Sequence, residues 1–125
     1  MRILARYRPW GYRNWGFLPT VLEIENLGVS GKIDFLLDTG AGRAILSEKD
    51  AQRLGLHYQN FPRGKPAIGV GGVANTWKIN EKVTLYIPVV GGGVFSASRE
   101  GIEILEESSE EKHLPSLLFG VSRRT

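Results

Sequence analysis

One short stretch of the chain combines residue types suited to acid–base chemistry. In residues 35–47, FLLDTGAGRAILS, an apolar run ends in Asp38, and Thr39, Gly40 and Ala41 follow. An ionised carboxylate at the end of a buried strand is costly unless hydrogen bonds hold it. A threonine hydroxyl and the backbone N–H groups of a glycine-containing turn can supply those bonds. On the tripeptide alone, a turn whose acid only bonds its own backbone is the alternative interpretation.

The segments around this stretch predict a mostly β fold. Short apolar runs alternate with glycine and proline, as expected of many short strands. FLPTVLEIEN and KIDFLLD predict two strands that form a hairpin through a turn at LGVSG. Further strands are expected in KVTLYIPVV, where Pro88 suggests an edge or an end, and in GVFSAS, GIEIL and the late run LPSLLFGV. The glycines at 91–93 predict a turn.

A helix and a glycine-rich hairpin interrupt the strands. SEKDAQRLG predicts a short helix at about 47–54, with Ser47 as its cap and Gly55 at its end. PAIGVGGVANTWKI predicts a hairpin whose two β-prone arms meet at glycines. Trp77 and Ile79 in its second arm are candidates for lining a pocket, with packing in the core as the equally supported alternative.

In this order the elements resemble the retropepsin-like aspartic proteases, the retroviral type. The resemblance runs from about Thr20 to Gly120, and its sharpest part is LLDTGAGRAILSEKDAQRLGL. It implies a small closed β-barrel-like acid protease fold, with one short helix after the Asp-Thr-Gly turn and a glycine-rich flap hairpin. We expect a single domain over residues 1–125, with a basic, aromatic N-terminal arm or strand at 1–19 and a protease-like core at 20–120.

The resemblance also implies roles for individual residues. Asp38 would be the catalytic aspartate. Its turn would be supported by Thr39, Gly40 and Ala41, with Thr39 bonding across to a partner subunit. The flap that closes over a substrate would consist of Ile68, Gly69, Val70, Gly71 and Gly72. The strand threaded near the active-site turn would contain Leu118, Phe119 and Gly120.

The chemistry of such a site predicts a homodimer. An aspartic protease needs two carboxylates that share a proton, because two like charges about 3 Å apart cannot both ionise. This chain has one Asp-Thr-Gly, and neither Asp34 nor Asp50 lies in a comparable turn. The second acid must therefore be Asp38 of another copy, across a two-fold axis. The expected substrate is a peptide or protein, and no cofactor or metal ion is expected.

The end of the chain departs from the family pattern. In the family, a helix and a strand that joins the dimer sheet follow the late apolar-apolar-Gly string, whereas here Gly120 is followed only by VSRRT. Either other elements such as the N-terminal stretch hold the dimer, or the chain is a shortened version. Gly42 also stands where the family often has a hydroxyl residue. The alternative function is a catalytically inactive peptide-binding or dimerisation module.

Composition narrows the remaining function classes. The absence of cysteine excludes disulfides, thiol catalysis and cysteine-ligated zinc. No apolar run is long enough to span a membrane and no secretory signal is evident, so a cytoplasmic location is expected. The arginines and aromatic residues near the N-terminus offer nucleic-acid binding as a distant alternative, given a net charge of only +3. A triad of Ser47, His57 and Asp50 is a poor candidate, because Ser47 is better explained as a helix cap.

Overall fold

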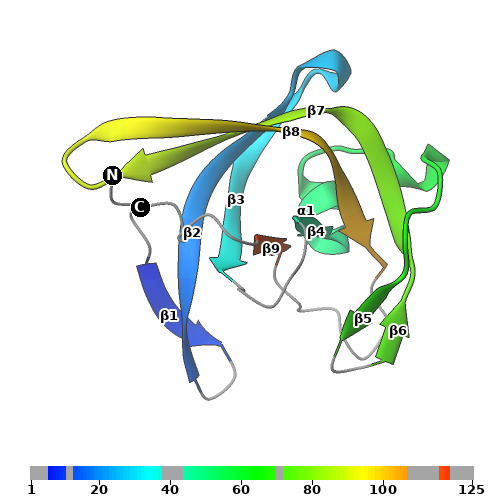
Figure 1. Cartoon of the computed structure of the whole chain (residues 1–125), viewed down its shortest axis with the longest axis horizontal. Helices are drawn as coiled ribbons and strands as arrows, with labels where there is room; N and C mark the ends of the chain where they lie inside the picture. Colours follow the sequence, from blue (N-terminus) through cyan, green and yellow to red (C-terminus); the bar gives the residue numbers. More distant parts are fainter. Residues whose placement is uncertain (1–5, 11–12, 38–43, 70–71, 107–115, 119–125) are drawn as a thin grey trace.

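The computed structural model describes residues 6–10, 13–37, 44–69, 72–106 and 116–118. Its elements, in chain order, are β1 (Arg6–Trp10), β2 (Arg13–Ile24), the 3-10 turn η1 (Glu25–Leu27), β3 (Val29–Leu37), β4 (Ile45–Ser47), α1 (Glu48–Arg53), η2 (Tyr58–Asn60), β5 (Ala67–Gly69), β6 (Gly72–Ala74), β7 (Thr76–Val89), β8 (Gly93–Leu105) and β9 (Ser116–Leu118). Figure 1 shows them along the chain.

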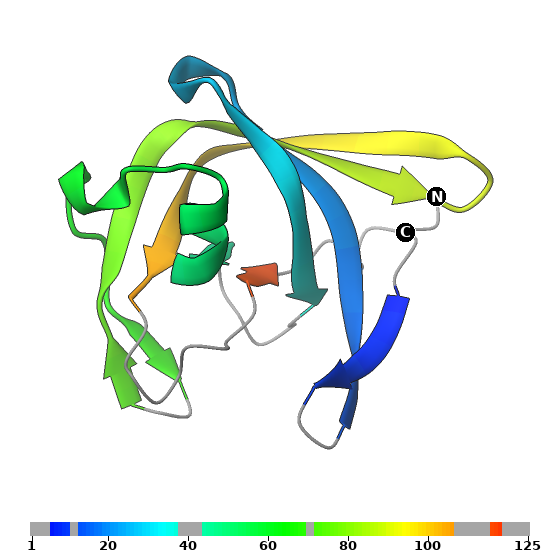
Figure 2. The same cartoon turned by 180° about the vertical axis from the view of Figure 1, so that it is seen from behind.

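One sheet carries most of the fold. Its strands follow the order β1-β2-β3-β9-β4-β8-β7, and β2 pairs in addition with β7, so the sheet curls round onto itself. Figures 1 and 2 show this curvature from opposite sides, with α1 packed beside the sheet. The prediction of a mostly β, barrel-like fold with one short helix is confirmed.

The core lies inside the curled sheet. In the second half of β7, buried Val83, Leu85 and Ile87 alternate with half-buried residues, the period of two expected of a strand with one apolar face. Trp77 is 7% exposed and Ile79 is fully buried, and both belong to the same core cluster. Of the two interpretations of this pair, the structure supports core packing.

Helix α1 begins and ends as its sequence predicts. The Ser47 hydroxyl accepts a hydrogen bond from the backbone N–H of Asp50 at 3.1 Å, which caps the first turn. Gly55 follows the helix with a positive φ of 81°. Within the part of the chain that the structure describes, no helix is both long enough and apolar enough to cross a membrane.

Several strand boundaries differ from the sequence-based prediction, and TWKI of the predicted hairpin and KVTLYIPVV form the single strand β7. The turn between β2 and β3 lies at residues 25–28, because Gly28 adopts a φ of 65° and Val29 already pairs with Ile24. LGVSG as a whole is therefore not the turn. The segments GVFSAS and GIEIL form the single strand β8, because the pairing with β7 continues through Arg99 and Glu100 and resumes at Ile102 after an irregularity at Gly101.

The seam between β2 and β7 carries a hydrogen bond that predicts a pH effect. Tyr86 Oη donates to Glu23 Oε1 at 3.1 Å, and this bond, with the negative charge of Glu23, raises the pKa of Tyr86 above its ordinary value of 10.0. A raised pKa in the folded state means that the stabilisation is complete below pH 10 and is lost as the pH rises through the folded-state value.

We therefore expect Tyr86→Phe to reduce the loss of stability between pH 9 and pH 12. Urea unfolding across this range measures the effect, and the wild-type protein should lose more of its unfolding free energy than the variant. Glu23→Gln is the matched control, because it removes the charge and keeps the phenol. An equal slope for wild type and Tyr86→Phe would show that this bond does not contribute.

Candidate active site

Strand β3 leads into the candidate catalytic residue. Asp38 follows directly after Leu37, the last residue of β3, while Asp38, Thr39, Gly40 and Ala41 themselves lie outside the described residues. Two strands flank the end of β3. On one side, Phe17 of β2 pairs antiparallel with Leu36, and on the other, β9 runs parallel to it. The chain therefore enters Asp38 from a strand held on both sides.

Strand β9 ends beside the same point. Its residues Ser116, Leu117 and Leu118 pair with Phe35, Leu36 and Leu37. β9 also contacts β4 on its other side, where Leu117 pairs with Ile45. Leu118, expected near the active-site turn, thus lies next to the residue that precedes Asp38. Phe119 and Gly120, expected in the same strand, lie outside the described residues.

The glycine-rich hairpin forms a unit of its own. β5 and β6 pair antiparallel, with Ile68 opposite Val73 and Gly69 opposite Gly72, and they make a two-stranded sheet separate from the main one. In both views the end of β3 points toward the side on which this hairpin projects (Figures 1 and 2). Val70 and Gly71 at its tip lie outside the described residues.

The base of the hairpin is anchored by a cluster around Trp77. The Arg63 guanidinium lies 4.3 Å from the centre of the Trp77 ring and 3.1 Å from Glu106 Oε2. Tyr58 meets the same ring edge-on, with centroids 4.9 Å apart. The backbone N–H of Lys78 donates to the carbonyl of Pro62 at 2.7 Å. These contacts hold the segments that lead into and out of the hairpin, which we call its stem, while β5 and β6 pair with each other.

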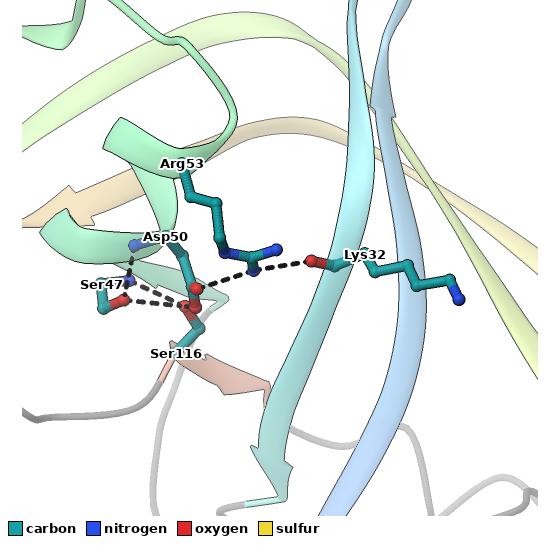
Figure 3. A network of polar contacts seen from close by, with 5 residues as sticks. All are labelled: Lys32, Ser47, Asp50, Arg53 and Ser116. Atoms are coloured by element: carbon teal, nitrogen blue, oxygen red, sulfur yellow. Dashed lines mark hydrogen bonds and ion pairs between the residues drawn. The ribbon is translucent and has the colours of Figure 1, made fainter.

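A polar network links β9 to the helix and to β3, as Figure 3 shows. The fully buried Ser116 hydroxyl accepts from the backbone N–H of Ser47 at 2.8 Å and donates to Asp50 Oδ2 at 2.7 Å. Asp50 Oδ1 pairs with Arg53 at 2.9 Å, and Arg53 also donates to the carbonyl of Lys32 at 2.7 Å. The network thus spans β9, β4, α1 and β3.

The sequence did not point to Ser116, and it placed Asp50 on the helix and in a poor candidate triad. The available signal was weak: a serine opens the apolar run SLLF, and an aspartate stands three residues after a helix cap. Ser47 is 3% exposed and serves as the cap, whereas His57 is exposed, so they do not form a triad with Asp50. Asp34 is exposed on β3. Among the described residues, no three acidic or histidine side chains gather as a metal site would require.

Comparisons with known proteins agree with this arrangement. A family model described as gag-polyprotein putative aspartyl protease matches residues 27–88, about half of the chain, including Asp38 and the glycine-rich hairpin. No individual curated protein sequence matches the chain.

Two solved structures share the fold. A retropepsin-like aspartic protease from Rickettsia conorii superimposes with a TM-score of 0.53 at 23% identity, over 88% of this chain and 80% of that one. EIAV protease, solved in complex with the inhibitor HBY-793, gives a TM-score of 0.50 at 17% identity, over 90% of this chain and 88% of that one. The family match, the shared fold and the position of Asp38 after β3 together identify the chain as a member of the retropepsin-like aspartic protease family.

Proposed function

We propose that the chain is an aspartic endopeptidase that acts as a homodimer and hydrolyses peptide bonds with a water held between two copies of Asp38. The observation that carries the proposal is the position of the single Asp-Thr-Gly directly after β3, whose end is flanked by β2 and β9, in a chain of this family. Each subunit supplies one acid, because the chain has no second Asp-Thr-Gly.

The chemistry follows from the shared proton. The ionised carboxylate takes a proton from the water, whose oxygen attacks the scissile carbonyl carbon. The protonated carboxylate meanwhile donates a hydrogen bond to the carbonyl oxygen, which stabilises the charge that develops there. Transfer of a proton to the amide nitrogen then lets the C–N bond break, giving an acid and an amine. Two carboxylates about 3 Å apart hold one proton between them, which provides both roles at once.

The hairpin of β5 and β6 is proposed as the flap over the substrate. Two features support this role: the hairpin forms a separate two-stranded sheet, and its stem is anchored by Arg63 and Trp77. Its proposed substrate-contacting residues are Ile68, Gly69, Val70, Gly71 and Gly72. A flap that closes over a bound peptide excludes water and offers backbone N–H and C=O groups to an extended chain.

A dimeric active site makes activity depend on concentration. We expect the activity per chain to rise with protein concentration and to level off where sedimentation equilibrium shows mostly dimer. Well below the dissociation constant, the total activity should follow the square of the concentration, because only the dimer contains both acids. A denatured protein serves as the substrate, with the products read by mass spectrometry.

Two outcomes would contradict the proposal. Cleavage by a strict monomer, with an activity per chain that does not change on dilution, would exclude the shared pair of acids. A stable dimer that binds peptides and cleaves none would instead support the peptide-binding module.

A further inference from the structure

We propose that Ser116 and Asp50 are positioning residues for Asp38: they fix the register of β9 beside β3 and thereby place the end of β3, which Asp38 follows in the chain. This inference rests on the proposed function, and it adds two residues that do not touch the substrate. It starts from the network in Figure 3.

The direction of the hydrogen bonds makes Asp50 the acceptor. The Ser116 hydroxyl carries one proton, and the backbone N–H of Ser47 can only donate to its oxygen. Of the two acceptors near that proton, Asp50 Oδ2 lies at 2.7 Å and Ser47 Oγ at 3.5 Å. The proton therefore goes to Asp50, whose other oxygen pairs with Arg53 at 2.9 Å. Both carboxylate oxygens are thus held by donors from different elements.

These bonds specify the register of a strand that is too short to fix its own. β9 pairs with β3 over three residues and with β4 at one. A shift by one residue would bring Leu117 or Pro115, neither of which has a side-chain donor, to the position of Ser116. The buried backbone N–H of Ser47 and the Asp50 carboxylate would then lose their partner, which is costly.

The register of β9 also determines which of its residues lies beside the end of β3. Leu118 is two residues beyond Ser116, about 7 Å along the strand, and it pairs with Leu37, the residue before Asp38. A second support comes from Arg53, which joins the Asp50 carboxylate to the carbonyl of Lys32 in β3 itself. Asp50 is therefore tied to both β9 and β3. Small displacements at a catalytic group are expensive, since about 1 Å can cost roughly 100-fold in rate.

The test is the kinetics of Ser116→Ala and Asp50→Asn, singly and together, in the full-length dimer. We expect each variant to lower kcat by about 10- to 100-fold and to change KM by less than about threefold, because the substrate contacts stay in place. Because the two residues share the hydrogen bond between them, the loss in the double variant should be smaller than the product of the two single losses. Active sites are counted by titration with a tight-binding transition-state analogue, so that loss of folded protein does not count as loss of rate.

Two controls separate positioning from general stability. Val83→Ala opens a cavity in the core on β7, away from the network, and should lower the melting temperature while kcat per active site stays unchanged. Ser98→Ala removes a hydroxyl from an exposed position on β8 and should change neither quantity. Both variants are assayed beside wild type under the same conditions.

The outcomes distinguish the two proposals. Full kcat per active site in Ser116→Ala, with wild type active, overturns the positioning role and leaves the proposed function intact. Losses that multiply in the double variant also overturn it, because the residues would then act separately. A wild-type protein that cleaves nothing overturns the proposed function, and the positioning role falls with it.

Discussion

Replacing Asp38 with asparagine is expected to lower peptide cleavage by at least about 10⁴-fold, while the fold and the dimer remain. Asparagine has nearly the size of aspartate, so the substitution removes the carboxylate with almost no change in side-chain volume. It cannot take a proton from water, and a pair of amides has no shared proton to give to the leaving nitrogen. Cleavage assays of the purified variant measure the loss, with thermal unfolding and sedimentation confirming the intact dimer.

Mixing wild-type chains with Asp38→Asn chains tests whether both acids belong to one site. When subunits exchange freely, a ninefold excess of the variant leaves about a tenth of the wild-type chains paired with another wild-type chain. The activity per wild-type chain should therefore fall to about a tenth. Unchanged activity in the mixture would show that one chain carries a complete site. Cleavage that survives in Asp38→Asn alone would exclude Asp38 as the catalytic acid.

The sequence predicted those parts of the fold that depend on local pattern. The helix followed from Ser47 as its cap and from Gly55, both of which act within a few residues. The β2–β3 hairpin followed from two strand-like runs separated by a glycine-containing segment. The position of the turn was wrong, because the sequence offers glycines at both 28 and 31, and only the positive φ of Gly28 identifies the one that belongs to the turn.

Pairings between strands that lie far apart in the sequence could not be predicted from local patterns. Ile45, Leu46 and Ser47 look like the approach to a helix, yet they form β4 by pairing with β8 more than fifty residues later. Ser116 and Ser47 are 69 residues apart, and their bond depends on β9 lying between β3 and β4. No periodicity in one sequence encodes that neighbourhood. For the same reason, the candidate site could be proposed from a motif, whereas the contacts of Ser116 with Ser47 and Asp50 became visible only in the fold.

Replacing Gly101 with alanine is expected to lower stability strongly, because Gly101 lies at an irregular point of the ladder between β7 and β8. Ile79 pairs with Ile102, and Lys82 pairs with Glu100, so Asn80 and Glu81 together face Gly101 alone. This is a β-bulge, which bends the strand pair. Gly101 has a φ of 118°, a region that side chains rarely adopt. A Cβ there would lie 2.7 Å from the carbonyl oxygen of Ile79, a backbone atom.

We expect Gly101→Ala to lower the free energy of unfolding by about 3 kcal/mol, the sum of backbone strain and crowding in a packed region. At fixed protein concentration this corresponds to a fall of roughly 10 °C in the melting temperature. Gly92→Ala is the matched control. Its φ of 90° is also unfavourable for alanine, but no atom lies within 4 Å of the added Cβ. That variant should lose only the strain, about 1–2 kcal/mol.

The difference in unfolding free energy between Gly101→Ala and Gly92→Ala tests whether the bulge is rigid. An equal loss in both variants would show that the carbonyl of Ile79 moves aside freely, and the steric argument would then be wrong. A larger loss at Gly101 would show that the bend between β7 and β8 is held rigidly. Two residues beyond the bend, Glu103 begins the segment of β8 that pairs with β4, and β4 leads directly into α1 and Asp50. A rigid bend at Gly101 would therefore fix the side of the barrel on which Asp50 holds Ser116.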